Sequence, residues 1–193
     1  MSASVTPEGL LHIFYSIEGL AFDLLQKGFF IRGAVVKGNV YHDDEMVFGK
    51  ALLQAYKLES EVVRFPRVMI TRDIVKDIEK YSQHPSWGSN FKDRLNQSDD
   101  GPFFLNVLRE IAEDIRRELG RDSRVTAEED DMLRMYGDIG KQIQRRFNDA
   151  IDNPNHFEKV QWFAAYWNRT IPKGVVGLNH IEGPGVTPRY WKG

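Results

Sequence analysis

The sequence predicts an α+β fold, and three observations support this prediction. Aromatic and β-branched residues run through positions 29–41 as in a strand, and an acidic turn leads into a short return strand at 46–48. A glycine opens a helical pattern at 49–60, and a short apolar strand follows at 67–70. Beyond residue 105, apolar residues recur at helical spacing. This order indicates an α/β or α+β layered fold, and we expect α+β with a C-terminal helical extension.

Composition limits the classes of protein to which the chain can belong. With 193 residues and a mass of 22.3 kDa, it is long enough for one domain with a real core and a helical appendage. Its 26 basic and 28 acidic residues are mixed along the chain, without the basic stripe that is typical of nucleic-acid binding. We therefore expect no nucleic-acid partner.

The residue types also indicate a compartment. The chain has no cysteine, which excludes disulfides and thiolate metal sites and favours the reducing cytoplasm. Glu8 precedes the first apolar run, and the basic segment and cleavage site of a signal peptide are not seen. That run, at 10–25, contains His12, Glu18 and Asp23, so it should not span a membrane. We expect a cytoplasmic protein without a membrane partner.

The first helix is predicted at residues 7–27. Pro7 suits a first helical turn, and Gly28 suits the position just after a helix. The apolar positions of this helix, spaced three and four residues apart, are Leu10, Phe14, Ile17, Ala21 and Leu24.

The strand-like run at 29–41 is largely apolar on both faces, so we expect it to be covered on both sides. His42–Glu45 is the predicted turn, and it leads into the return strand. After the strand at 67–70, Thr71 is expected to cap a helix at about 72–82.

Composition shifts after Tyr81. Residues 82–90, rich in Pro, Gly, Ser and Asn, are predicted to form a loop. Phe91–Leu95 and Pro102–Leu105 are predicted to pair as strands, and the second strand leads into a helix at about 106–119.

Two further helices are predicted in the C-terminal part. Thr126 and Glu129 form a capping box that is expected to open a long helix, which Asn153 and Pro154 end. Its apolar stripe consists of Met132, Tyr136, Ile139, Ile143 and Phe147. The last helix is marked by Phe157, Val160, Ala164 and Trp167. From Pro172 onward, a tail rich in glycine and proline is expected to be irregular.

Two motifs in the first half resemble those of a known enzyme family. Residues 34–38, AVVKG, are similar to the strand pattern G-I-x-x-G, with alanine in place of the first glycine. Residues 49–58, GKALLQAYKL, are similar to the pattern G-x-x-V-N-x-A-x-R-L that starts a helix after a hairpin. Together with IRGAV at 31–35 and PRVMI at 66–70, they resemble class III nucleotide cyclases. The likeness is greatest to a bacterial branch near the antiphage-defence cyclases that make cyclic pyrimidine nucleotides.

The resemblance implies a fold and an activity. It covers residues 7–80 and continues more weakly at 99–108 and 160–170. It implies a partial ferredoxin-like cyclase core at 1–80, with a loop, hairpin and helical extension at 81–193. Members of the family convert a nucleoside triphosphate into a cyclic nucleotide and pyrophosphate at an active site formed across a dimer interface. The expected partners are therefore a nucleoside triphosphate and a second copy of the chain.

The resemblance also implies Mg²⁺ or Mn²⁺, held by two aspartates that lie in the family on strands before the helix at 7–27. These ions activate the ribose hydroxyl and neutralise the phosphates. Nothing before Phe29 resembles that N-terminal metal-binding half, and Asp23 lies on the polar side of a helix rather than at a strand end. The chain is therefore expected to lack the metal ligands and to be incomplete or inactive alone.

Two polar positions of the family's helix can be matched to this sequence. The asparagine that orients the ribose corresponds to Leu53, which cannot form a hydrogen bond with it. The arginine that stabilises the transition-state charge corresponds to Lys57, which keeps the charge without the two-pronged geometry. Lys57 is the candidate catalytic residue, and the alternative is a solvated helix lysine.

Arg32 and Tyr56 are the candidate nucleotide-binding residues. Arg32 lies in an apolar strand, where an unpaired charge is costly. It would bind a phosphate or base, or pair with Glu18, Asp23 or Glu59, and the ion pair is the favoured interpretation. Tyr56 would stack on a base or, as a helix tyrosine beside two leucines, lie in the core.

Two clusters have alternative interpretations. Residues 42–45 offer three carboxylates and an imidazole for Mg²⁺ or Mn²⁺, but these residue types also favour tight turns, and a hydrated turn is the favoured interpretation. The metal ligands therefore remain unknown. The aromatic cluster at 162–167 is expected in the core or at a dimer interface, and it comprises Trp162, Phe163, Tyr166 and Trp167.

Without the first strands of the family's sheet, the hairpin at 29–48 would have an unpaired edge. Three explanations remain open: a shortened version of a longer product, a partner that supplies the strands, or covering by the helical region. The leading functional hypothesis is a nucleotide-cyclase-like protein. The rival is a non-catalytic nucleotide-binding or dimerisation module on the same scaffold.

Overall fold

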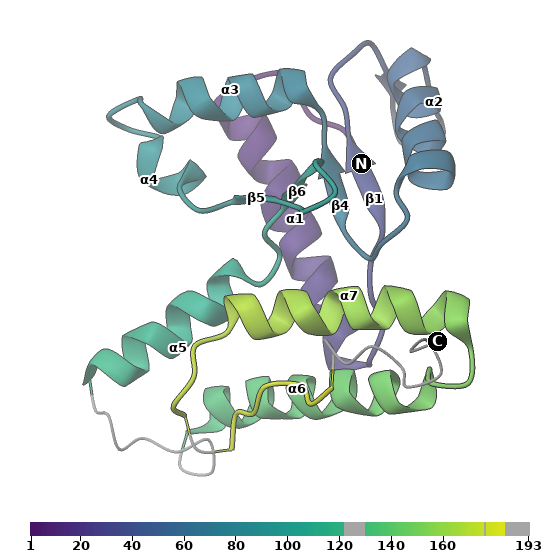
Figure 1. Ribbon diagram of the computed structural model, residues 1–193. Helices are drawn as coiled ribbons and strands as arrows, with labels where there is room; N and C mark the ends of the chain where they lie inside the picture. The colour runs from purple at the N-terminus through teal and green to yellow at the C-terminus, as the bar shows by residue number, and fades with distance from the viewer. Residues whose placement is uncertain (122–129, 176, 184–193) are drawn as a thin grey trace. The chain divides into compact units, whose positions relative to one another are not determined.

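The computed structural model describes residues 1–121, 130–175 and 177–183. These residues form an α+β fold with seven α-helices, a four-stranded mixed sheet and a separate two-stranded hairpin (Figure 1). The predicted α+β class is thus confirmed. The chain divides into two compact units: unit 1 contains residues 1–22 and 30–107, and unit 2 contains residues 23–29 and the chain from Leu108 onward. The predicted division after residue 80, which rests on the cyclase resemblance, stays a prediction.

The four-stranded sheet lies in unit 1 and has the strand order β1-β4-β6-β5. The central strand β4 is buried along its whole length, pairs in parallel with β1 and pairs antiparallel with β6. β5 pairs antiparallel with β6, so β1 and β5 are the two edges. The strands are β1 Gly33–Val35, β4 Val68–Ile70, β5 Leu95–Gln97 and β6 Phe103–Leu105.

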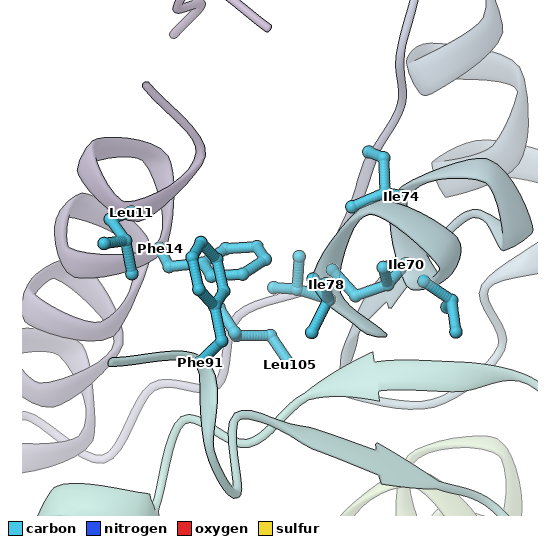
Figure 2. Close-up of a cluster of buried hydrophobic side chains, with 9 residues drawn as sticks. Leu11, Phe14, Ile70, Ile74, Ile78, Phe91 and Leu105 are labelled. Carbon is cyan, nitrogen blue, oxygen red and sulfur yellow. The ribbon is translucent and has the colours of Figure 1, made fainter. Parts of the chain in front are cut away.

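Helices α1, α3 and α4 contribute apolar side chains that meet those of β4 and β6 in one buried cluster (Figure 2). The helices are α1 Pro7–Gln26, α3 Arg72–Ser82 and α4 Gly88–Phe91. The cluster comprises Leu11, Phe14, Val68, Ile70, Ile74, Val75, Ile78, Phe91 and Leu105. Burial of this many large side chains, each stabilising by about 1.5–3 kcal/mol, makes this cluster the main stabilising feature of unit 1.

Helix α1 confirms the first predicted helix, and Gly28 closes its C-terminal end as the sequence indicates. Gly28 has a φ of 73° and its N–H donates to Leu25 O, while the N–H of Phe29 donates to Leu24 O. These two hydrogen bonds satisfy carbonyls at the helix end that would otherwise lack a donor.

The predicted strand at 29–41 is wrong over most of its length. Only Gly33–Val35 forms β1, because its parallel partner β4 has just three residues and β1 has no neighbour on its other side. The expected covering of both faces is also wrong, since the residues of this edge strand are only half-buried.

The hairpin and the helix after it are confirmed, although the hairpin stands apart from the main sheet. Strands β2 (Tyr41–His42) and β3 (Val47–Phe48) pair antiparallel. Helix α2 (Lys50–Lys57) follows and continues as the π-helix η1 (Leu58–Val62), two residues beyond the predicted end. Helix α2 lies beside both β1 and β3.

The second half of unit 1 matches the prediction in its elements and differs in detail. Helix α3 has the predicted bounds, but the hydroxyl of Thr71 donates to Val35 O at 3.3 Å and makes no side-chain cap. The predicted pairing of two strands near 91–105 is confirmed as β5 with β6. However, β5 begins four residues later than expected, because Phe91 ends helix α4 within the predicted loop and is buried in the cluster.

Unit 2 is helical in the residues that the structure describes. It comprises α5 Arg109–Arg121, α6 Asp131–Asp149 and α7 Pro154–Thr170, of which α6 and α7 lie side by side (Figure 1). The predicted capping box of Thr126 and Glu129 lies outside the described residues. Asp130 caps α6, its Oδ1 accepting from the N–H groups of Met132 at 2.9 Å and Leu133 at 3.0 Å.

The side chains predicted to form the core of these helices are mostly buried. Tyr136, Ile139, Ile143 and Phe147 of the α6 stripe are buried, and Met132 is half-buried. Asn153 caps α7, with Pro154 in its first turn, as the predicted helix break requires. In α7 the buried residues include Val160, Phe163, Ala164, Tyr166 and Trp167. The aromatic cluster therefore belongs mainly to the core. The described part of the tail after Thr170 has no regular secondary structure, as expected.

Candidate functional site

The residues that the sequence singles out lie around α2 and the β2–β3 hairpin, within unit 1. The hairpin is attached to the start of α2, where the N–H of Ala51 donates to Asn39 O at 3.3 Å. Gly49 allows this approach: its φ is 144°, and a Cβ there would lie 2.6 Å from Asn39 O and 2.9 Å from the Cα of Val40. The glycine that opens the helix is therefore required by the backbone next to it.

A set of large apolar side chains is exposed on the hairpin and α2, and we call it the hairpin–α2 surface. Leu53 and Tyr56 are each 69% exposed, which is unusual for such residues in a helix. The rings of Tyr41 and Phe48 stack with their centroids 5.0 Å apart, and about half of each side chain remains exposed. The surface comprises Tyr41, Met46, Val47, Phe48, Leu52, Leu53 and Tyr56.

The acidic tip of the hairpin is a closed turn. The Oδ1 atom of Asp43 accepts from the N–H groups of Glu45 and Met46, both at 2.9 Å, and its Oδ2 accepts from the hydroxyl of Tyr41 at 2.7 Å. The Tyr41 hydroxyl and the two backbone donors lower the pKa of Asp43, and the same carboxylate raises the pKa of Tyr41. Asp43 thus uses both oxygens within the turn, which supports the favoured turn interpretation.

No group of three or more His, Asp or Glu side chains in the described part of the chain is arranged to hold a metal ion. The binding of Mg²⁺ or Mn²⁺, which the cyclase resemblance implies, stays a prediction.

Lys57, the candidate catalytic residue, is the last residue of α2. Its side chain is 72% exposed, and Nζ lies 4.0 Å from Glu61 Oε2 one turn later. An exposed pair at this distance is worth little, so the ammonium group is available to another anion.

Arg32 lies just before β1, and its side chain is exposed rather than enclosed in an apolar strand. Its Nε donates to Glu59 Oε1 at 2.6 Å, and Nη2 also contacts that oxygen. Glu59 is one of the three expected carboxylates. The two side chains are 38% and 31% exposed, so the expected burial of Arg32 is wrong.

Tyr56 faces solvent, and its alternative place in the core is wrong. Tyr56 and Lys57 are adjacent on α2. Arg32 forms an ion pair with Glu59, which lies in the η1 continuation of the same helix. The three candidate residues are thus gathered along α2–η1. Their roles in nucleotide binding and catalysis stay predictions.

Three of the hollows formed by the described residues lie elsewhere, and none of the three candidate residues lines them. One of about 660 Å³ lies between α6 and residues 177–183, and one of about 640 Å³ lies between α3 and α4. The third, of about 460 Å³, is formed by α6 and Gln26. The side chains of Arg32, Tyr56 and Lys57 are instead exposed on the surface of unit 1.

Two buried arginines were missed by the sequence analysis. Arg94 donates from Nη1 to the carboxylate of Glu18, in a pair that is almost fully buried, and its guanidinium lies 4.4 Å from the ring centroid of Tyr15. Arg67 makes two hydrogen bonds of 2.6 Å to Asp100. A signal for the first pair was present, because Glu18 follows Phe14 by one helical turn and so lies on the apolar face of α1.

Comparisons with protein-family models, curated proteins and solved structures gave no match to the chain. None of the helices in the described ranges is both long and apolar enough to cross a membrane.

Proposed function

We propose that the chain is a nucleotide-cyclase-like module that acts by binding and association rather than by catalysis on its own. The observation that supports this proposal is the exposure of Leu53, Tyr56 and Lys57 on the outer face of α2. Side chains on the convex face of a helix enclose a ligand only when a second surface faces them, because binding sites are concave. A nucleotide site built on these residues would thus be shared with a partner.

The proposal also covers the fold of the chain and its location in the cell. The order of strand, hairpin, helix and strand over residues 33–70, on which the cyclase resemblance rests, supports a partial ferredoxin-like cyclase core. The absence of cysteine supports a place in the reducing cytoplasm.

Two features favour a binding module over an enzyme. Leu53 stands where the cyclase resemblance calls for a ribose-binding asparagine, and it adds apolar surface instead of a hydrogen-bond donor. Asp43, the best-placed carboxylate of the acidic tip, has both oxygens engaged in the turn.

A second candidate function is cyclisation of a nucleoside triphosphate by a parent enzyme that contains this module. Lys57 favours it, because an exposed ammonium group with one distant carboxylate neighbour can contact a phosphate. In that reaction the ribose 3′-oxygen bonds to the α-phosphorus, pyrophosphate leaves and the hydroxyl proton is lost. Lys57 would stabilise the charge on the phosphates.

The experiment uses the purified chain with each of the four nucleoside triphosphates and Mn²⁺. Binding is followed by calorimetry, and cyclic nucleotide is followed by chromatography against a sample without protein. We expect binding that weakens several-fold in Lys57→Ala, with no cyclic product. Lys141→Ala is the matched control, because Lys141 is equally exposed but lies on α6 of unit 2.

Each result has a clear meaning. Product above the blank, at a rate abolished by Lys57→Ala, would replace the binding module with the enzyme. Absence of binding to every nucleotide would remove nucleotides as ligands of this chain.

A further inference from the structure

Two side-chain amides hold the main chain of residues 177–183, a segment without regular secondary structure that passes along α6 (Figure 1). Asn168 of α7 accepts at Oδ1 from the N–H of Ile181 at 2.7 Å, and its Nδ2 donates to Ile181 O at 2.8 Å. Gln144 of α6 pairs in the same way with Glu182, accepting at 2.7 Å and donating at 3.4 Å. An amide carries a donor and an acceptor side by side, so it can replace the neighbouring strand that a peptide backbone would otherwise bind.

The backbone of residues 177–183, which we call the docked segment, lies very close to α6. A Cβ at Gly137 would lie only 2.8 Å from Gly177 O, so this position of the helix must be glycine. One turn later, a Cβ at Gly140 would lie 3.7 Å from Asn179 O. Glycine weakens a helix interior relative to alanine, and at Gly137 it leaves room for the backbone of the docked segment.

Apolar side chains anchor the same stretch at a spacing of three residues. Leu178 and Ile181 are each 3% exposed, and Val175 is 4% exposed. Between them, Asn179 is exposed and His180 is half-buried, with its Nε2 atom 2.9 Å from Ile171 O. Main-chain hydrogen bonds and buried side chains at regular positions are the two means by which proteins bind linear peptides.

The groove has space beside the docked segment. The hollow of about 660 Å³ described above lies between the segment and α6, and its volume is in the range of ligand pockets, about 300–1,000 Å³. Asn179 lines this hollow, opposite Lys141 and Gln144 of the helix. Among the described residues the space is open, so a peptide with a larger side chain in place of Asn179 has room there.

We propose that α6 and α7 form a binding groove for a linear peptide, and that the docked segment is its internal ligand, which a peptide segment of a partner protein replaces. The partner's segment has aliphatic residues three apart, as at Leu178 and Ile181, and a side chain larger than that of Asn179 between them. The groove lies within unit 2 and does not depend on the proposed nucleotide site.

Hydrogen exchange of the wild-type chain is the first test, because it distinguishes an internal ligand from a part of the core. The N–H groups of Ile181 and Glu182 should exchange through a local opening, at lower denaturant concentration than the amides of α6 and α7. If they exchange only together with the two helices, the docked segment is part of the core and the inference is wrong.

Peptide binding is the second test. A labelled peptide with the sequence of residues 175–183 is added to the full chain, and fluorescence anisotropy follows binding. The peptide should bind the variant Leu178→Asp with Ile181→Asp, whose own segment leaves the groove. It should bind the wild type at least about tenfold more weakly, because a tethered ligand has an effective concentration on the order of millimolar. Asn179→Ala, at an exposed position of the same segment, is the matched control and should behave as the wild type.

Circular dichroism shows whether the double variant keeps its helices. If it does and no peptide binds, the inference is overturned. If the double variant unfolds, the docked segment is required for folding, and that result also overturns the inference.

The last test concerns recognition of the main chain. In the double variant, Asn168→Leu should weaken peptide binding about tenfold, as expected for the loss of two hydrogen bonds. Asn155→Leu, the same change at an exposed position in the first turn of α7, should have no effect. A peptide with Asn179→Tyr should bind more tightly than the natural sequence. Unchanged affinity in Asn168→Leu would refute main-chain recognition, and weaker binding of the Asn179→Tyr peptide would refute the larger side chain assigned to the partner.

Discussion

Burial distinguishes two arginines of unit 1 that pair with glutamates, Arg94 and Arg32. Arg94 and Glu18 are 1% and 9% exposed, and the Nε atom of Arg94 also donates to Asn90 O. Arg32 and Glu59 share a similar geometry, but about a third of each side chain is exposed to water. Removing one partner of a buried pair leaves an uncompensated charge in a medium of low dielectric, whereas water solvates the remaining partner of an exposed pair.

The first prediction compares these pairs. Arg94→Ala should lower the free energy of unfolding by about 3–5 kcal/mol, because Glu18 is left buried without its cation. Arg32→Ala should cost less than about 1 kcal/mol. Urea unfolding of both variants measures the difference.

The double variant Glu18→Leu with Arg94→Met serves as the control. It should recover much of the loss, since neither charge remains buried. Equal losses in Arg94→Ala and Arg32→Ala would show that burial does not set the strength of these pairs.

The second prediction concerns acid. The guanidinium of Arg67 is the main cause that lowers the pKa of Asp100 to about 2. The unfolded-state pKa is about 3.9, so the folded state gains stability from ionised Asp100 above that pH and loses it as the pH falls toward 2. Because the Asp100 side chain is 44% exposed, the gain should stay below about 1 kcal/mol.

Thermal melts of the wild type and Asp100→Asn measure this effect. The wild type should melt higher at neutral pH, and the gap should narrow steadily below about pH 4. Asp44→Asn, with the same change of charge on the hairpin tip, is the control. A gap that stays constant down to pH 2 would contradict the linkage.

An element could be predicted from the sequence when the residues of that element carry the pattern that specifies it. Helices α1, α3, α6 and α7 carry apolar periodicity and terminal residues of their own, so their existence was predictable, and for α3 the bounds as well. The strand predicted at 29–41 was too long, because the length of β1 is set by its three-residue partner β4, which is distant in sequence. The residue types at 29–41 do not indicate the length of a partner strand that lies elsewhere in the sequence.

The same reasoning applies to the candidate site. The order of hairpin, glycine and helix was visible in the sequence, and so was a carboxylate partner for Arg32. The exposure of Tyr56 was not predictable, because a tyrosine beside two leucines has the composition of a buried helix face. Only the packing of neighbouring elements decides which face is covered.

The third prediction is made for the start of α2. Gly49→Ala should destabilise the protein by about 1–3 kcal/mol, because φ is 144° and the added Cβ would meet backbone atoms of the hairpin. Gly19→Ala, in the interior of α1, meets no atom within 4 Å and should stabilise by about 0.5–1 kcal/mol. Denaturant unfolding of the two variants should therefore give opposite signs, and equal signs would contradict the assigned backbone at Gly49.

At the scale of the whole molecule, the chain has two compact units with separate sets of buried side chains. Phe14 belongs to the cluster of unit 1, whereas Trp167 is fully buried in unit 2. Compact units with their own cores can open separately, and hydrogen exchange detects such openings.

The fourth prediction uses this separation. Phe14→Ala should remove about 3–5 kcal/mol from unit 1 by leaving a cavity in its core. Exchange of the β4 amides, Val68–Ile70, should accelerate, while protection of the α7 amides should be retained. The reciprocal variant Ile143→Ala should affect α7 and spare β4. An equal loss of protection in both elements from either variant would mean that the molecule unfolds as one body.

The membership of residues 23–29 in unit 2 has a consequence for synthesis on the ribosome. This segment is joined to α6 by a 2.9 Å hydrogen bond from Arg146 Nε to Gly28 O and by the Arg146 guanidinium, 5.3 Å from the Phe29 ring centroid. At a translation rate of about 5–20 residues per second, roughly 6–24 s pass between the addition of Gly28 and that of Arg146. During that interval the end of α1 is made without Arg146, so a nascent chain stalled before α6 should leave Gly28 O without its side-chain donor and the Phe29 ring without its cation.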